Sequence, residues 1–153
     1  EFIKIEISLR EPLLEPVGNN LARTLLIDPF TGSTMFDAVT VNTLSYKESY
    51  AEKFRAALTR KEPAIRDIYD IHVACKSGNL NIYDAAFIEL IRNKLNVPGN
   101  DPVNLSSERI RILREQLTGE LRPVLRDVDY DGFDLEDSIS VVTDIAKNFG
   151  SSG

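Results

Sequence analysis

The sequence predicts an α+β protein in which a small β region is followed by a helical bundle. Residues 2–9 alternate strictly between apolar and polar side chains, which is typical of a strand with one buried face. From about residue 46 the apolar residues instead recur every three or four positions, as in amphipathic helices. We therefore expect a β-rich region over residues 1–45, a helical domain over 46–149 and a flexible tail over 150–153.

Three strands are expected in the β region. The first covers residues 2–9, where Lys4 and Glu6 share the polar face. The second covers about residues 23–28 and is followed by Pro29-Phe30-Thr31-Gly32-Ser33, a sequence with the chemistry of a turn. The third covers residues 36–43, in which apolar and polar side chains again alternate.

The rest of the chain contains residues that are typical of the starts and ends of helices. Ser45 with Glu48 three residues later forms a capping box, which predicts a first helix over about 46–60. Pro63 is expected to start a second helix that ends near Gly78. Three further helices are expected, over about 82–95, from 106 to 119 and over about 135–149. The longest loops are then 96–105 and 119–134.

Composition narrows the classes of function. The formal net charge of −6 over 153 residues argues against binding nucleic acid through bulk electrostatics, so any RNA contact would use a local basic cluster. The single cysteine excludes an internal disulfide and fits a reducing compartment. The sequence has neither a signal peptide nor an apolar run long enough to cross a membrane, so a cytoplasmic location is expected.

The first predicted helix carries a candidate phosphate-binding pair. Lys53 and Arg60 are seven residues apart, which is two helical turns, so both side chains point the same way. Lys53 also lies at the edge of the apolar stripe, a placement that suits a lysine holding triphosphate oxygens. The alternative is a lysine whose stem covers the core while its ammonium reaches water.

The second predicted helix carries a pair of carboxylates. Asp67 and Asp70 are one turn apart, on the side away from the apolar stripe, where they could bind a metal, position a base or hold an arginine. The alternative is a solvated acidic face that pairs with Arg66 or Arg60. Because the connection between the two helices is short, we expect Asp67 to lie beside Lys53.

Two other patterns are weaker indications of a metal site. The run Asp127-Val128-Asp129-Tyr130-Asp131-Gly132 matches the first half of an EF-hand loop, but its position twelve is Ser138 where a glutamate is needed. The alternative is an acidic loop that caps the last helix. His72 and Cys75 form too small a group for a metal site and are expected in the core.

Taken together, the motifs are similar to those of a known family. The order Lys-Ile-Glu-Ile on a strand, then Ala-Glu-Lys-Phe-Arg at 51–55, then Arg-Asp-Ile-Tyr-Asp at 66–70 resembles the AbiEii/AbiGii nucleotidyltransferase toxins, which have a polymerase-β-like fold. The resemblance is most specific over residues 2–75. It implies that Lys53, Asp67 and Asp70 are catalytic, that Lys53 and Arg60 bind nucleotide, and that Glu6 is a metal ligand.

The resemblance also implies substrates and partners. It implies an NTP as nucleotidyl donor, Mg²⁺ as cofactor, an acceptor such as tRNA, and a cognate antitoxin as protein partner. The family's Gly-Ser turn and Asp-x-Asp strand precede the acid strand, and residues 1–5 cannot supply them. We therefore expect this chain to be the C-terminal part of such an enzyme, inactive alone. The alternative is a non-catalytic helical interaction module on a degenerate nucleotidyltransferase scaffold.

Overall fold

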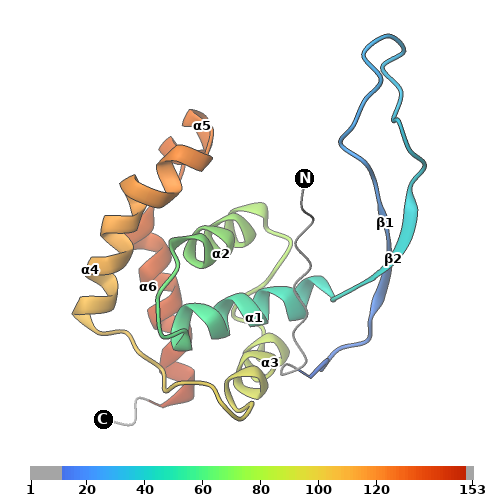
Figure 1. Ribbon diagram of the computed structural model, residues 1–153. Helices are drawn as coiled ribbons and strands as arrows, with labels where there is room; N and C mark the ends of the chain where they lie inside the picture. Colours follow the sequence, from blue (N-terminus) through green and yellow to red (C-terminus); the bar gives the residue numbers. More distant parts are fainter. Residues whose placement is uncertain (1–11, 151–153) are drawn as a thin grey trace.

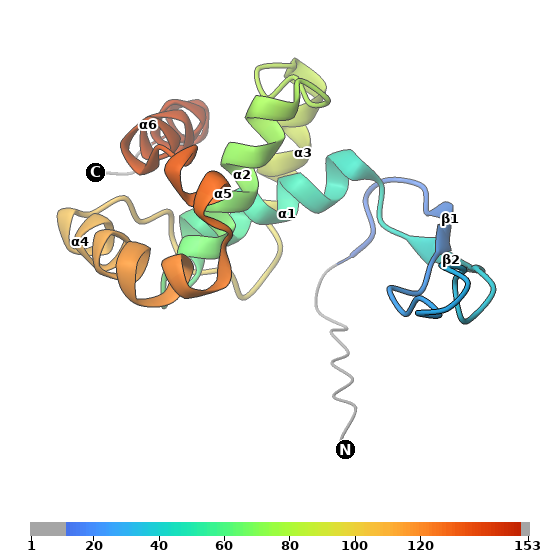
Figure 2. The ribbon, with the colours of Figure 1, turned by 90° about the horizontal axis from the view of Figure 1, so that it is seen from above.

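The computed structural model describes residues 12–150 and has the predicted α+β architecture. A helical body is built around α1 (Tyr46–Thr59), and a long β-hairpin leaves this body on one side, as the two views in Figures 1 and 2 agree. The expected strand at residues 2–9, with Lys4 and Glu6, lies outside the described residues.

The hairpin pairs two five-residue strands. β1 (Gly18–Ala22) and β2 (Val39–Thr43) are antiparallel, with Gly18 opposite Thr43 and Ala22 opposite Val39. The strand expected at 23–28 was therefore placed too late. The strand expected at 36–43 is confirmed only over its last five residues.

The predicted turn is confirmed and explains why pairing stops before it. The Asp28 carboxylate accepts hydrogen bonds from the backbone N–H groups of Phe30 and Thr31 at 2.8 and 3.0 Å, and Gly32 has a positive φ of 71°. One isolated bridge, between Ile27 and Thr34, closes this turn. The rest of residues 23–38 forms an open loop because these local bonds replace a continuous ladder.

α1 begins at the predicted cap but uses Glu48 differently from a capping box. The Ser45 hydroxyl accepts a hydrogen bond from the Glu48 N–H at 3.0 Å, as expected. The Glu48 side chain turns instead into the protein, where it is fully buried. The second half of the predicted capping box is therefore wrong, because Glu48 has better partners elsewhere.

Those partners belong to the segment before the hairpin and to α3 (Ala85–Leu95). Glu48 accepts the N–H groups of Leu14 and Glu15, both at 2.9 Å, and pairs with the buried Lys94 ammonium at 2.7 Å. Lys94 also donates to the carbonyl of Pro12 at 2.9 Å. This buried pair, here called the Glu48–Lys94 clamp, holds the start of the described chain against the helical body.

The next two helices follow the sequence signals closely. α2 (Ile65–Ser77) ends at Gly78, whose φ of 67° is the left-handed conformation that glycine adopts at helix ends. α3 ends one residue before Asn96, as predicted, but it begins three residues later than expected. Its start is set by a turn in which Asp84 donates its N–H to the Asn81 carbonyl.

The C-terminal third contains more helix than predicted. α4 (Ser107–Gln116) continues through a wide π turn at Leu117–Leu121 and a short 3-10 turn at Arg122–Val124. α5 (Asp127–Asp131) and α6 (Leu135–Ala146) follow, and a 3-10 turn at Lys147–Phe149 ends the described chain. The loop expected at 119–134 is thus wrong, since most of it is helical.

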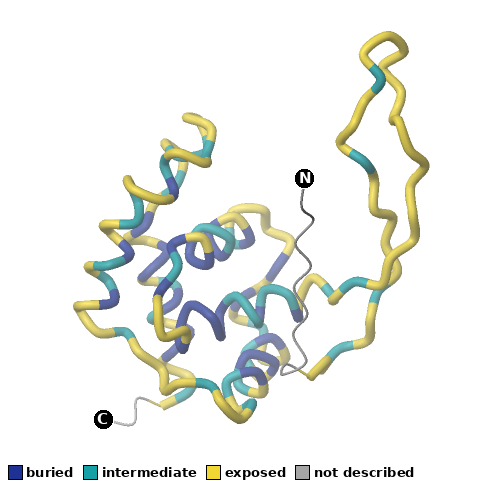
Figure 3. The backbone as a smooth tube through the Cα atoms, viewed as in Figure 1, coloured by how far each residue is buried: buried dark blue, intermediate teal, exposed yellow. Residues whose placement is uncertain are grey.

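One apolar core unites the helices. α1 packs against α2, α3 and α6, and the rings of Phe54 and Phe87 meet edge to face with centroids 5.8 Å apart. Other fully buried members come from four helices: Leu58, Ile71, Ile91 and Ile145. The hairpin takes no part in this core and is exposed along nearly its whole length (Figure 3). None of the described helices is both long and apolar enough to span a bilayer.

The Glu48–Lys94 clamp yields a stability prediction. Replacing Glu48 with Ala leaves a buried ammonium without its carboxylate, so the free energy of unfolding should fall by about 3 kcal/mol. Urea denaturation followed by circular dichroism measures this loss. Glu115, an exposed glutamate that pairs with Arg111, is the matched control, and its replacement with Ala should leave the unfolding midpoint unchanged. Equal effects at the two positions would contradict the structural role of the clamp.

The same glutamate predicts a pH dependence. Burial raises the pKa of Glu48, but Lys94 and the two backbone N–H groups lower it by more. The pKa therefore lies below its ordinary value of 4.5. A lowered pKa stabilises the fold above pH 4.5, and this contribution is lost as the pH falls through the folded-state pKa. Unfolding free energies measured at several pH values below 4.5 should therefore fall less steeply for Glu48→Gln than for the wild type.

Candidate functional site

The candidate site lies where α1 and α2 meet. The helices are joined by only five residues, 60–64, and pack against each other. Gln116 of α4 fixes this connection, because its amide donates to the Pro63 carbonyl and accepts the Ile65 N–H, both at 2.9 Å. The start of α2 is therefore held close to the last turn of α1.

This packing brings the predicted charged residues together. The Lys53 ammonium lies 3.1 Å from Oδ1 of Asp67 and 2.8 Å from Oδ2 of Asp70. The Arg60 guanidinium lies 3.2 Å from the other oxygen of Asp67. The proximity expected from the short connection is thus confirmed, whereas the catalytic and nucleotide-binding roles of these residues stay predictions.

Asp67 is buried, contrary to the exposed position expected from its place on the helix. Its side chain is 4% exposed, compared with 40% for Asp70. The helical wheel placed Asp67 away from the apolar stripe of α2, but Arg60 and Lys53 of α1 cover that face. Its Oδ2 atom accepts no hydrogen bond within residues 12–150. The ion pair with Arg60 is therefore the interaction that stabilises the charge on this oxygen. The alternative interpretation, a solvated acidic face, therefore fits Asp70 but not Asp67.

Lys53 is held as a cation with one face open. Burial by itself lowers the pKa of Lys53, but Asp70 and Asp67 raise it more, so the pKa lies above its ordinary value and the ammonium is charged at neutral pH. An ammonium has three N–H donors, and two of them face the aspartates. Because the side chain is 38% exposed, the third donor can reach a ligand.

Tyr50, one helical turn before Lys53, stays protonated beside this cluster. Burial, the Tyr46 hydroxyl and the charge of Asp70 together raise the pKa of Tyr50 to about 12. At neutral pH its hydroxyl can therefore donate a hydrogen bond but cannot serve as a base.

A buried arginine, Arg109 of α4, braces the site from behind. Its guanidinium donates to the carbonyls of Ala57 at 2.7 Å and Arg60 at 2.6 Å, so it caps the last turn of α1. The sequence analysis did not single out this residue. The available signal was its position on the apolar face of α4, four residues before the buried Leu113.

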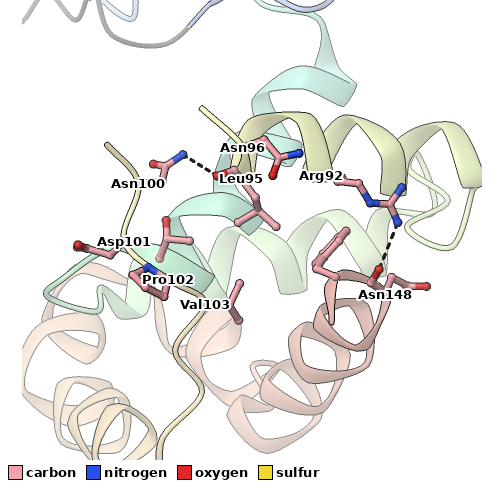
Figure 4. Close-up of a pocket in the computed structure, with 10 residues that line it drawn as sticks. Arg92, Leu95, Asn96, Asn100, Asp101, Pro102, Val103 and Asn148 are labelled. Atoms are coloured by element: carbon pink, nitrogen blue, oxygen red, sulfur yellow. Dashed lines mark hydrogen bonds between the residues drawn. The ribbon is translucent and has the colours of Figure 1, made fainter. Parts of the chain in front are cut away.

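An open pocket of about 390 Å³ lies on another face of α1, lined in part by Thr59. Thr59 follows Lys53 by six residues, so the two side chains point in different directions around the helix. As Figure 4 shows, two of the polar side chains at this pocket are held by backbone carbonyls: Arg92 donates to the Asn148 carbonyl and Asn100 to the Leu95 carbonyl. The charged cluster at Lys53 therefore remains the stronger candidate.

The described residues do not fit a magnesium site. No group of three or more His, Cys, Asp or Glu side chains in residues 12–150 could hold a metal ion, and Asp67 and Asp70 are both engaged by cations. Glu6, the predicted metal ligand, lies outside the described range. Any step that needs a metal therefore depends on residues beyond those described.

The half EF-hand motif is not a loop. Residues 127–131 form α5, and the carboxylates of Asp127 and Asp129 pair with Arg122 and Arg126 at 2.6 Å. The alternative, an acidic segment that caps the last helix, is confirmed at Asp134, whose side chain accepts the Asp137 N–H at 2.9 Å at the start of α6.

His72 is in the core, as expected, whereas Cys75 is only half-buried. The His72 ring nitrogens lie 3.1 Å from the Ser138 hydroxyl and 3.1 Å from the Gly132 carbonyl. These contacts join α2 to α6 and give the histidine a structural role.

Lys53 and Arg60 share the buried carboxylate of Asp67, and lysine and arginine are the side chains that proteins use to bind phosphate groups. A sequence model described as nucleotidyl transferase AbiEii toxin, type IV TA system, matches residues 1–143. The chain therefore belongs to the AbiEii family, whose members are described as nucleotidyltransferase toxins of type IV toxin–antitoxin systems. Comparisons with curated proteins and with solved structures gave no match.

The unequal burial of the two aspartates predicts unequal coupling to Lys53. In double-mutant cycles of Lys53→Met with Asp67→Asn or Asp70→Asn, the coupling in unfolding free energy should be about 1 kcal/mol for Asp67 and a few tenths for Asp70. The reason is that water screens the exposed Lys53–Asp70 pair more strongly. Urea denaturation of the six proteins provides the values, and a stronger coupling to Asp70 would contradict this account.

Proposed function

We propose that the chain is the C-terminal part of a nucleotidyltransferase toxin that transfers a nucleotidyl group from an NTP to an acceptor such as tRNA. Membership of the AbiEii family supports the reaction class. The observation that carries the proposal is the Lys53 ammonium, which is fixed by two aspartates and still partly open to solvent.

The arrangement suits the binding of phosphate oxygens. Arg60 shares the buried Asp67 carboxylate with Lys53, so Asp67 opposes the charge of Lys53 less than it would alone. In the proposed reaction an acceptor hydroxyl oxygen forms a bond to the α-phosphorus, the bond to the bridging oxygen breaks, pyrophosphate leaves and the hydroxyl proton passes to solvent. Lys53 would bind the phosphate chain and stabilise the charge that develops on the pyrophosphate.

In this proposal Asp67 and Asp70 orient the lysine. A single long lysine side chain has many rotamers, and the two ion pairs restrict it to one direction before the nucleotide arrives. A cognate antitoxin is the protein partner that the family suggests. Mg²⁺ would depend on Glu6 and on an Asp-x-Asp strand supplied from outside the described residues.

One observation favours the alternative of a non-catalytic interaction module. The hairpin exposes large apolar side chains, with Leu25 95% and Phe30 96% exposed. The upstream gene sequence distinguishes the two functions, because a Gly-Ser turn followed by Asp-x-Asp would support the enzyme.

Transfer of labelled nucleotide tests the proposal directly. In the protein that includes the Asp-x-Asp strand, Lys53→Ala should lower transfer to an RNA acceptor by at least about a hundred-fold, because it removes a charge that acts on the phosphates. Lys147→Ala is the matched control, since Lys147 is an exposed lysine that also pairs with an aspartate, Asp144. Transfer by Lys53→Ala at the rate of the control would contradict the proposed role.

A further inference from the structure

A third cation, the buried Arg109, lies close to the cluster formed by Lys53, Arg60, Asp67 and Asp70. Arg109 is 5% exposed, and its Nε and Nη2 atoms donate to the Ala57 carbonyl at 3.1 and 2.7 Å. Its Nη1 atom donates to the Arg60 carbonyl at 2.6 Å. The guanidinium is thus fixed beneath the turn of α1 that presents the Arg60 side chain to Asp67.

The contacts of Arg109 satisfy its donors without neutralising its charge. All of its side-chain hydrogen bonds within residues 12–150 go to uncharged backbone carbonyls of α1. Burial lowers the pKa of Arg109, the charge of Asp67 acts in the opposite direction and that of Arg60 adds to the lowering. Arg109 is therefore close enough to interact electrostatically with both Asp67 and Arg60.

The balance of charge at the site depends on this residue. Lys53 and Arg60 alone would be balanced by Asp67 and Asp70. With Arg109 included, the cluster has an excess of one positive charge. A neutral cluster offers a phosphate chain little attraction, whereas a net cation with a buried, weakly screened member attracts it.

We propose that Arg109 supplies the net positive charge that the site needs to bind phosphate, while its carbonyl contacts stabilise the α1 turn that precedes Arg60. The proposal rests on the proposed nucleotidyltransferase function. It assigns two separable effects to one side chain, because a lysine at this position would keep the charge while losing most of the carbonyl contacts.

Two substitutions separate these effects. Arg109→Lys keeps the charge, and Arg109→Met keeps only an apolar stem. The titrations use the protein that includes the Asp-x-Asp strand, at low ionic strength and at a temperature where circular dichroism shows every variant folded. Calorimetric titration with ATP should give a dissociation constant for Arg109→Lys near that of the wild type. For Arg109→Met it should be at least about five-fold weaker. Thermal stability should fall in both variants, because both lose carbonyl contacts. Equal affinities for the Lys and Met variants would overturn the proposal.

Two further variants complete the test. Arg111→Met removes one positive charge from an exposed position on the same helix, away from the cluster, so it should leave ATP affinity unchanged. Arg60→Gln removes one positive charge at an exposed side chain and should weaken ATP binding even if the Arg109 variants do not fold. Unchanged affinity in Arg60→Gln would overturn the charge argument. If the wild type does not bind ATP, the proposed function itself fails, which is a different result from equal binding by the two Arg109 variants.

Discussion

The last turn of α1 imposes a constraint that much of the molecule satisfies. A helix ends with carbonyl groups that have no partner inside the helix, and here they lie inside the protein, where water cannot bond to them. From α4, Arg109 donates to the carbonyls of Ala57 and of Arg60, the residue that follows α1, and the Asn104 N–H donates to the Leu58 carbonyl. The course of the chain from residue 104 to α4 therefore follows from how α1 ends.

Two buried carboxylates, those of Glu48 and Asp67, each face several groups that share their charge. Glu48 faces one ammonium and two backbone N–H groups, and Asp67 faces an ammonium and a guanidinium. Such arrangements are costly to build in a small core, because each charge loses its water. Their structural effects differ, because the clamp fixes the segment that leads into the hairpin, whereas the Asp67 cluster leaves part of Lys53 exposed.

The sequence predicted the helices well because their signals are local. Ser45, Gly78 and the apolar spacing within each helix act over a few residues, and the ends of α1, α2 and α3 follow from them to within a few residues. The meeting of Lys53 with Asp67 was also predictable, since a short connection leaves little choice. Three other features were not predictable: the strand at Gly18–Ala22, the buried role of Glu48 and the contacts of Arg109. Each depends on partners that are distant in the sequence.

The exposed hairpin has a consequence for handling the protein. Within the described residues, both strands of its two-stranded sheet are edge strands, so one side of each presents backbone groups that another strand can bind. Apolar side chains such as Leu25 and Phe30 are exposed in the loop that joins these strands, where Asp28 is one of the few charged residues. Self-association through the hairpin is therefore expected in solution. Lowering the salt concentration would do little to prevent it, because the surface has few charges. A mild detergent, or a charged residue introduced at the tip of the hairpin, would reduce it.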